Sequence, residues 1–296
     1  MKVFLTGATG YIGSNLAVRL AELKHEVSAL IRSSDAANRL PFSVKSIIGD
    51  MQGAAWIDAV ISSDAIIHTA FPPPLGGLDA SLAVERSFLA RLADLIRGSD
   101  RTLIVTNGAI FLGDSGPGRF DETAAVQAGH PAAARAAITA EAIGTQSIRG
   151  VELRLANFVY GHGGGTFGPR LTSVARAERS SAYVLDGQAT TSCVHVDAVV
   201  EAFILALEAP MAVGVYNVAS EEEPSWKQLA EAVALNVSVP SRSLSTEAAA
   251  QHFDPFTAMF MTTTSRLDAS RIRRELGWTH AGHSPLLWEL ASGGHE

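Results

Sequence analysis

Cysteine is almost absent from this 296-residue chain, which carries Cys193 alone. A single cysteine cannot form a disulfide within one chain, and this scarcity is typical of proteins in reducing compartments. No stretch approaches the roughly 18 consecutive apolar residues that a membrane-spanning helix requires. The N-terminal MKVFLTGATG reaches its glycines before the apolar segment of a signal peptide develops. We therefore expect a cytoplasmic protein that does not enter a membrane.

Basic charge is also scarce, because 23 Lys and Arg residues stand against 30 Asp and Glu residues, a formal net charge of −7. Without a run of Lys or Arg, nucleic acid is excluded as the main partner. Hydrophobic residues make up 47% of the chain and charged residues 18%, which excludes a disordered chain and allows a large core with a second lobe. Tyrosine and lysine occur only four times each, which limits the proton-transfer groups that the chain offers.

Short apolar runs alternate with longer helical patterns through the first half of the sequence. The short runs are nearly continuous in Val, Ile and Leu, as expected for strands that are covered on both faces. The predicted strands span residues 2–6, 26–31, 44–48, 65–69, 102–106 and 151–157, and the predicted helices span residues 12–23, 78–96 and 132–148. Strand–helix–strand repetition implies right-handed crossovers, so we predict an α/β fold with a doubly wound parallel sheet.

A turn with three glycines spaced three residues apart, TGATGYIG, directly follows the first predicted strand and opens the first predicted helix. Such glycines allow a tight turn and close approach of the backbone to a pyrophosphate, and the helix N-terminus offers free N–H groups to the phosphates. In an alternating chain, this position favours a dinucleotide-binding turn over glycines that serve the turn alone. The residues expected to contact the dinucleotide here are Thr6, Gly7, Thr9, Gly10, Tyr11, Ile12 and Gly13.

The second predicted strand is followed directly by Arg32-Ser33-Ser34. NAD-selective sites commonly place a carboxylate near this point for the ribose 2′-hydroxyl, whereas an arginine suits the 2′-phosphate of NADP. Arg32 and Ser33 therefore favour NADP(H) over NAD(H) as the cofactor. The alternative is that Arg32 is a solvated surface residue.

After Tyr160 the pattern changes to a glycine-rich loop and then to short, mixed segments broken by prolines. The exception is residues 196–208, whose apolar side chains recur at helical spacing and indicate a helix that packs back on the sheet. We predict a dinucleotide-binding domain and a smaller C-terminal α+β lobe that holds the substrate. The domain is assigned to residues 1–162 and 193–212, and the lobe to residues 163–192 and 213–296.

These motifs resemble the extended short-chain dehydrogenase/reductases, the NAD-dependent epimerase/dehydratase group. TGATGYIG is similar to the family's dinucleotide signature, RLANFVYG at 154–161 to its RPxxVYG segment, and VHVD at 194–197 to its VHVDD segment. The resemblance implies a Rossmann domain, a small-molecule substrate and a homodimer formed through the helices at 78–96 and 132–148. It extends the expected cofactor contacts to Asp50, Met51, Thr69, Ala70, Phe71 and Thr106. The expected substrate contacts are Phe71, Asn107, Asn157 and Tyr160.

Some of these positions have a second interpretation. Asp50 either binds the adenine or caps the helix that follows it. The segment at 71–77, FPPPLGG, either covers the nicotinamide pocket or is an ordinary rigid loop. His280 and His283 lie three residues apart without a third ligand nearby, so no metal site is expected.

The family's chemistry depends on a tyrosine with a lysine four residues later, because the ammonium lowers the pKa of the phenol. Residues 15, 164, 187 and 220 stand four positions after the four tyrosines, and none of them is lysine. Gly108 occupies the position that resembles the family's catalytic serine. The candidates for a substitute proton donor are Tyr160, His130 and Thr106, and Arg135 offers positive charge but is too basic to donate a proton.

Two functions remain open at this point. The chain is either an epimerase/dehydratase-like oxidoreductase with a non-standard proton donor, or a catalytically degenerate sensor or regulatory protein that binds NADP. The oxidoreductase would act on a small carbonyl, hydroxyl or sugar-type substrate. The retained lobe and glycine-rich loop favour the enzyme, because both are easier to explain if a small molecule still binds.

Overall fold

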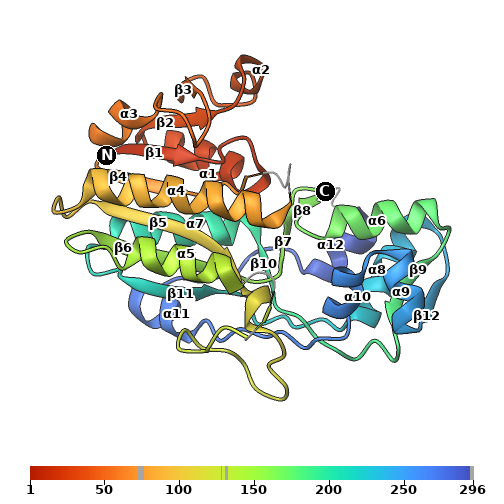
Figure 1. Cartoon of the computed structure of the whole chain (residues 1–296). Coiled ribbons are helices and arrows are strands. Elements are labelled where there is room, and N and C mark those ends of the chain that lie inside the picture. The colour runs from red at the N-terminus through yellow and green to blue at the C-terminus, as the bar shows by residue number, and fades with distance from the viewer. Residues whose placement is uncertain (73–76, 128, 131–132, 294–296) are drawn as a thin grey trace.

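A seven-stranded parallel sheet forms the larger of two lobes in the computed structural model, which describes residues 1–72, 77–127, 129–130 and 133–293 (Figure 1). The strand order is β11-β6-β5-β4-β1-β2-β3. The strands are β1 (Lys2–Thr6), β2 (Glu26–Ile31), β3 (Lys45–Ile48), β4 (Ala65–His68), β5 (Thr102–Gly108), β6 (Arg149–Leu155) and β11 (Gly214–Val218). The strand order reverses between β1 and β4, and ligands of open α/β sheets bind at such a switch point.

Helices cover both faces of this sheet. On one face α1 (Tyr11–Glu22) packs against α7 (Val196–Glu208), and on the other α4 (Leu78–Ile96) packs against α3 (Ile57–Ile61) and α5 (Ala133–Ile143). The short helix α2 (Ser34–Ala37) follows β2. Among the described residues, no helix is both long enough and apolar enough to cross a bilayer. The predicted doubly wound α/β fold is confirmed.

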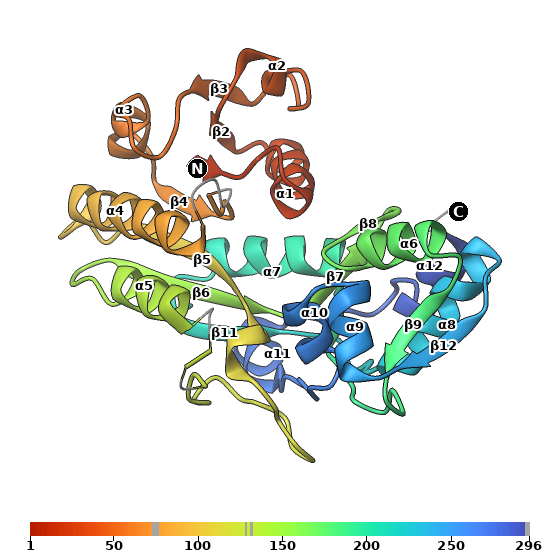
Figure 2. The ribbon, with the colours of Figure 1, turned by 45° about the vertical axis from the view of Figure 1, so that its right-hand side comes forward.

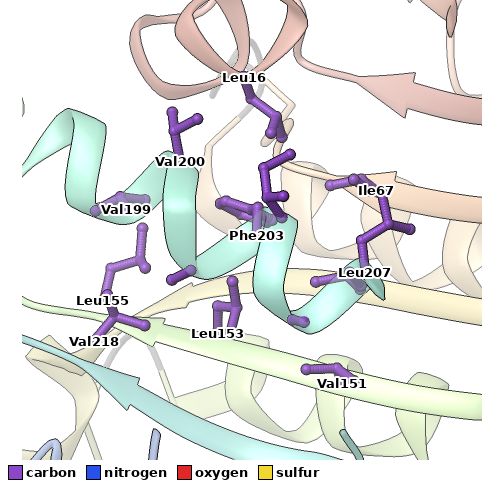
Figure 3. Close-up of a cluster of buried hydrophobic side chains, with 14 of the residues drawn as sticks. Leu16, Ile67, Val151, Leu153, Leu155, Val199, Val200, Phe203, Leu207 and Val218 are labelled. Atoms are coloured by element: carbon purple, nitrogen blue, oxygen red, sulfur yellow. The ribbon is translucent and has the colours of Figure 1, made fainter. Parts of the chain in front are cut away.

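The helix α7 supplies the largest part of the core on its face of the sheet. Val199, Phe203 and Leu207 are at most 1% exposed and lie at helical spacing. Figure 3 shows Phe203 between Leu16 of α1 and Leu153 of β6. The sequence-predicted helix at 196–208 is confirmed with the same bounds, because every third or fourth residue of it is apolar and buried.

The smaller lobe has its own core and sheet. Its helices are α6 (Gly168–Ala177), α8 (Trp226–Val237), α9 (Thr246–His252), α10 (Pro255–Phe260) and α12 (Leu286–Ser292), which Figure 2 shows gathered beside the larger lobe. A two-stranded parallel sheet pairs β9 (Ser181–Val184) with β12 (Ser241–Leu244). In this core, the ring of Trp226 contacts the rings of both Phe158 and Phe260.

A three-stranded sheet joins the two lobes. It consists of β10 (Cys193–His195), β7 (Phe158–Gly161) and β8 (Gly164–Gly165), with β7 in the middle. The chain therefore leaves the large sheet after β6, enters the smaller lobe through β7, and returns through β10 to α7. This path brings the glycine-rich loop against the first turn of α1.

The structure differs from the sequence prediction at several element ends. Residues 214–218, which the sequence assigned to the smaller lobe, form β11 and pair in parallel with β6 at the edge of the large sheet. The helix α5 ends at Ile143, five residues before its predicted end, because Gly144 is a poor helix former. The predicted start of this helix at residue 132 lies outside the described residues. The helix α11 (Ser270–Leu276) packs on β11, so part of the C-terminal segment also belongs beside the large sheet.

Replacing Phe203 by alanine tests the role of α7. The side chain is fully buried, so Phe203→Ala is expected to lower the free energy of unfolding by about 3–5 kcal/mol through the cavity that it leaves. The control is Val18→Ala on the exposed face of α1, which is expected to change stability by less than about 0.5 kcal/mol. Urea denaturation followed by far-UV circular dichroism measures both, and equal effects would contradict the packing described.

Candidate functional site

A cavity of about 630 Å³ lies at the carboxyl ends of β1, β2 and β4. This is the switch point of the sheet, where the strand order reverses. Ten of the sequence-predicted cofactor residues line it, namely Thr6, Gly7, Thr9, Gly10, Arg32, Asp50, Met51, Thr69, Ala70 and Phe71. The structure therefore brings these ten residues together around one cavity, and their roles toward a ligand stay predictions.

The glycine turn forms one wall of the cavity and has no room for side chains at two positions. Gly7 has a φ of +81°, and a Cβ on it would stand 2.5 Å from Thr69 Oγ1. A Cβ on Gly13 would stand 2.1 Å from the carbonyl oxygen of Gly7. The first N–H groups of α1 have no partner within the helix, so this turn offers them to an anion. The glycine turn and the N-terminus of α1 together fit a dinucleotide pyrophosphate.

The remaining predicted cofactor residues do not line the cavity. Tyr11 donates its hydroxyl hydrogen to the carbonyl oxygen of Gly161 at 2.9 Å, and burial raises the pKa of this phenol. Ile12 packs against the hydrophobic core, and Gly13 lies against the backbone of Gly7. Ser33 is exposed at the start of α2. Tyr11 instead ties the start of α1 to the glycine-rich loop.

The opposite end of the cavity carries two arginines. Arg32 and Arg39 both line it and both are exposed to solvent. Asp50 also lines it, and its Oδ1 accepts hydrogen bonds from the N–H groups of Gln52 at 3.0 Å and Gly53 at 2.8 Å. The sequence analysis did not predict Arg39, because no motif marks it. Its only distinguishing feature in the sequence is a positive charge a few residues after Arg32.

A chain of buried polar side chains runs from the glycine turn to α5. Thr6 Oγ1 lies 2.8 Å from Nδ1 of His68, and Nε2 of His68 lies 3.3 Å from a carboxylate oxygen of Glu85. Because a carboxylate only accepts, His68 donates to Glu85 through Nε2, and its Nδ1 pairs with the hydroxyl group of Thr6. Arg135 completes the chain by donating to both oxygens of Glu85 at 3.0–3.1 Å.

Glu85 is ionised although its side chain is fully buried on α4. Burial alone would raise the pKa of this carboxyl group, but hydrogen bonds from His68 and Arg135 and the charge of Arg135 outweigh burial and hold the pKa below the usual range of a glutamate. The carboxylate in turn fixes the guanidinium of Arg135, whose side chain is 19% exposed. The result is a positioned positive charge on the first turns of α5.

Arg135 contacts a residue of the cavity wall, and His130 contacts a residue of the smaller lobe. The guanidinium carbon of Arg135 lies 4.8 Å from the ring centre of Phe71, which lines the cavity. The ring of His130 lies edge-on to Phe256 of α10, with centroids 6.3 Å apart, and burial lowers the pKa of His130. The predicted covering loop at 71–77 lies outside the described residues from 73 to 76.

Thr106 and Asn107 lie at the carboxyl end of β5. Thr106 is buried, and its Oγ1 has no hydrogen-bond partner within the part of the chain that the structure describes. Asn107 is engaged, because its Nδ2 donates to Thr139 Oγ1 at 3.0 Å, and Thr139 donates to Glu152 at 2.6 Å. The structure thus leaves Thr106, and not Asn107, with an uncommitted polar atom.

The structure does not bring Tyr160 and Asn157 to the 630 Å³ cavity. Tyr160 donates its hydroxyl hydrogen to the carbonyl oxygen of Ser284 at 2.9 Å, and burial raises its pKa. It lines a separate cavity of about 320 Å³ in the smaller lobe. Asn157 donates to Ser265 Oγ at 2.9 Å within a buried cluster. Both residues serve the connection between the lobes.

A doubly wound sheet with a glycine turn at its first strand–helix junction and a cavity at its switch point defines a dinucleotide-binding protein of the Rossmann class. Within that class, the chain belongs to the NAD dependent epimerase/dehydratase family, whose model matches residues 3–219. An uncharacterized protein of Schizosaccharomyces pombe is 30% identical over 294 residues, which cover 99% of both chains. A 3-diazoavenalumate denitrifying reductase of a Streptomyces species is 28% identical over 297 residues, covering 94% of this chain and 95% of the relative.

Solved structures share the fold at low sequence identity. A UDP-glucose 4-epimerase from Thermotoga maritima, solved with UDP-glucose, superposes with a TM-score of 0.77 at 17% identity and covers 99% of this chain and 97% of its own. A dTDP-glucose 4,6-dehydratase from Bacillus anthracis, solved with NAD, superposes with a TM-score of 0.76 at 15% identity and covers 99% and 95%. These likenesses establish the fold of the whole chain.

Replacing Glu85 by glutamine tests the buried ion pair. Glu85→Gln is expected to cost about 3–5 kcal/mol of unfolding free energy at pH 7, because it leaves the guanidinium of Arg135 without its counter-charge. Since the folded pKa of Glu85 lies below the usual pKa of a glutamate, its contribution to stability is present above that usual pKa and disappears as the pH falls through the folded pKa. The difference in unfolding free energy between wild type and Glu85→Gln should therefore become smaller at acid pH.

The control for this measurement is Glu141→Gln, because Glu141 pairs with Arg86 on the surface, where the two side chains are 61% and 49% exposed. An exposed pair is worth less than about 1 kcal/mol. Chemical denaturation at a series of pH values measures both variants. If the loss of unfolding free energy in Glu85→Gln were the same at every pH, Glu85 would not be ionised in the folded protein.

Proposed function

We propose that the protein is an NADP(H)-dependent oxidoreductase that acts on a small carbonyl, hydroxyl or sugar-type substrate. The observation that carries this proposal is the 630 Å³ cavity, which has the glycine turn at one end and Arg32 with Arg39 at the other. Family membership supports a nicotinamide dinucleotide as the ligand. The name of the Streptomyces relative, a reductase, supports reduction as the direction of the reaction.

NADP(H) is preferred in this proposal because two arginines line the end of the cavity that the second strand forms. Guanidinium groups bind phosphate oxygens through paired, charge-assisted hydrogen bonds, and a 2′-phosphate offers such oxygens. The glycine turn would hold the pyrophosphate, while Asp50 keeps a carboxylate oxygen available beside the adenine after its Oδ1 accepts two backbone N–H groups.

Removing the arginines tests the preference. Arg32→Ala and Arg39→Ala are each expected to weaken NADP(H) binding by about 10-fold or more, because a hydrogen bond to a charged group contributes about 1.5–3 kcal/mol. Binding of NAD(H) should stay within about 2-fold of wild type. The control is Arg97→Ala, which removes an exposed arginine at the end of α4. Fluorescence titration measures all affinities, and an unchanged NADP(H)/NAD(H) ratio would contradict the assignment.

The chemistry requires a proton donor and a stabiliser of negative charge beside the transferred hydride. When bound, the nicotinamide would supply or accept the hydride. We assign proton donation to His130, an imidazole whose pKa burial lowers from its ordinary value, so that its protonated form is a stronger acid than a free imidazolium. Arg135, fixed by Glu85, would stabilise the negative charge that develops on the substrate oxygen. The unpartnered hydroxyl of Thr106 would donate a hydrogen bond to the substrate.

Tyr160, the other donor candidate, is not preferred. Its hydroxyl hydrogen is already donated to the carbonyl oxygen of Ser284, and its raised pKa makes it a weaker acid. The Tyr160 ring also contacts His195 edge-on, with centroids 5.4 Å apart, in the connection between lobes. These contacts suit a structural role.

Substitution at the two basic residues tests this chemistry. His130→Asn is expected to lower kcat by about 10²–10⁴-fold, the usual contribution of a general acid. Arg135→Lys keeps the charge but loses the paired hydrogen bonds to Glu85, and it should lower kcat while NADP(H) affinity is retained. The matched control is Tyr160→Phe, which should keep near wild-type turnover.

NADPH oxidation is measured against a panel of aldehydes, ketones and keto-sugars. Full turnover in His130→Asn together with loss in Tyr160→Phe would reverse the assignment of the donor. Tight NADP(H) binding without turnover of any carbonyl compound would instead favour the sensor, the second function that the missing Tyr-x-x-x-Lys pair leaves open.

A further inference from the structure

A second cluster of chemically active side chains lies on the other side of α1 from the dinucleotide cavity. His162 follows β7, His195 ends β10, and Asp197 lies in the first turn of α7. One nitrogen or oxygen atom of each residue lies within 4.8 Å of the others. No function described above uses these three residues.

The spacing of these atoms suits a metal ion. His162 Nε2 lies 3.0 and 3.1 Å from the two carboxylate oxygens of Asp197, and His195 Nδ1 lies 3.6 Å from Asp197 Oδ2. Ligands of a tetrahedral ion at about 2.0–2.2 Å stand about 3.3–3.6 Å apart, so small side-chain shifts bring all three atoms into one coordination sphere. Two imidazoles and a carboxylate are a common donor set for first-row transition metals.

The surroundings leave one side of the cluster accessible. His162 and Asp197 are 57% and 44% exposed and line a cavity of about 550 Å³ between α1, α7 and the C-terminal segment. His195 is buried, and its Nε2 lies 3.9 Å from a carboxylate oxygen of Glu289. A histidine that binds a metal usually directs its other ring nitrogen at a carboxylate, and Glu289 stands at that position.

The local backbone holds His162 against the cluster. His162 has a φ of +53°, unusual for a residue with a side chain, and lies between Gly161 and Gly163, which also have positive φ. A Cβ on Gly161 would stand 2.3 Å from His195 Nε2, so only glycine allows this loop to lie so close to the histidine. Tyr11 of α1 also holds this loop in place through its hydrogen bond to the carbonyl oxygen of Gly161.

We propose that His162, His195 and Asp197 bind a divalent transition-metal ion of the Zn²⁺ class, with the remaining coordination position open to the 550 Å³ cavity. The ion replaces the 3.2 Å hydrogen bond that His195 Nδ1 accepts from the N–H of Asp197. The ion thereby links the glycine-rich loop, through His162, to the start of α7, through Asp197. The sequence expectation of no metal site considered only His280 and His283, because the three ligands become neighbours through the pairing of β7 with β10 and the turn into α7.

Metal titration of the full-length, tag-free protein tests this site. After treatment with a chelator, wild type is expected to bind one Zn²⁺ or Co²⁺ per chain, with the Co²⁺ complex giving the d–d absorption of a low-coordinate site. His162→Ala and Asp197→Asn should weaken binding by at least about 10-fold. His162 is exposed and asparagine retains the shape of Asp197, so both variants should fold, which circular dichroism checks.

His280→Ala is the matched control, because His280 is a partly exposed histidine of the C-terminal segment beside the 550 Å³ cavity and lies outside the cluster. It should bind Co²⁺ as wild type does. Zn²⁺ should also raise the thermal midpoint of wild type and leave that of His162→Ala unchanged. Absence of stoichiometric binding by wild type, or equal affinity in wild type and the two ligand variants, would overturn the proposal. None of these readouts depends on turnover, so they are independent of the oxidoreductase assignment.

Discussion

The helix α1 starts so close to the end of β1 that a Cβ on Gly13 would stand 2.1 Å from the carbonyl oxygen of Gly7. Because β1 lies between β4 and β2 inside the seven-stranded sheet, this contact sets the position of α1 over β1 and β2. The cavity opens beside the same turn, and the unpaired N–H groups of α1 provide its anion-binding end. The glycine-rich loop then rests on α1 through Tyr11, so the connection to the smaller lobe also depends on this turn.

The buried chain of polar side chains from Thr6 to Arg135 connects the glycine turn to α5. A charge in the interior is costly unless it is paired, and Glu85 and Arg135 satisfy each other through paired hydrogen bonds. The chain begins on the glycine turn and ends beside Phe71, so the wall of the cavity and the positive charge near it belong to one network.

Local patterns were sufficient to predict the doubly wound sheet, the glycine turn and the bounds of α7. These features depend on residues that are close in the sequence and on the regular spacing of buried apolar side chains. The strand β11 was missed because GVYNV is short and follows a proline-broken stretch, so only its pairing with β6 identifies it. Arg39 carries no motif, and its place in the cavity depends on how the short helix α2 turns the chain.

Side-chain partnerships over long sequence separations were the least predictable part of the site. Glu85 and Arg135 are 50 residues apart, and only the packing of α4 on α5 makes them a pair. His130 was recognised as a candidate because imidazole chemistry depends on residue type alone. Tyr160 was selected by its place after a strand, and its hydroxyl instead points to a carbonyl group of the distant C-terminal segment.

The order of the strands has a consequence for synthesis of the chain. The sheet is not complete when β6 has formed, because β11 arrives only after the first part of the smaller lobe and α7 have been made. Until then β6 presents an unpaired edge, a surface to which other extended chains can add. A nascent chain released before residue 214 would keep that edge exposed, so ribosomal arrest or proteolysis at this point should yield a fragment that aggregates rather than a smaller working domain.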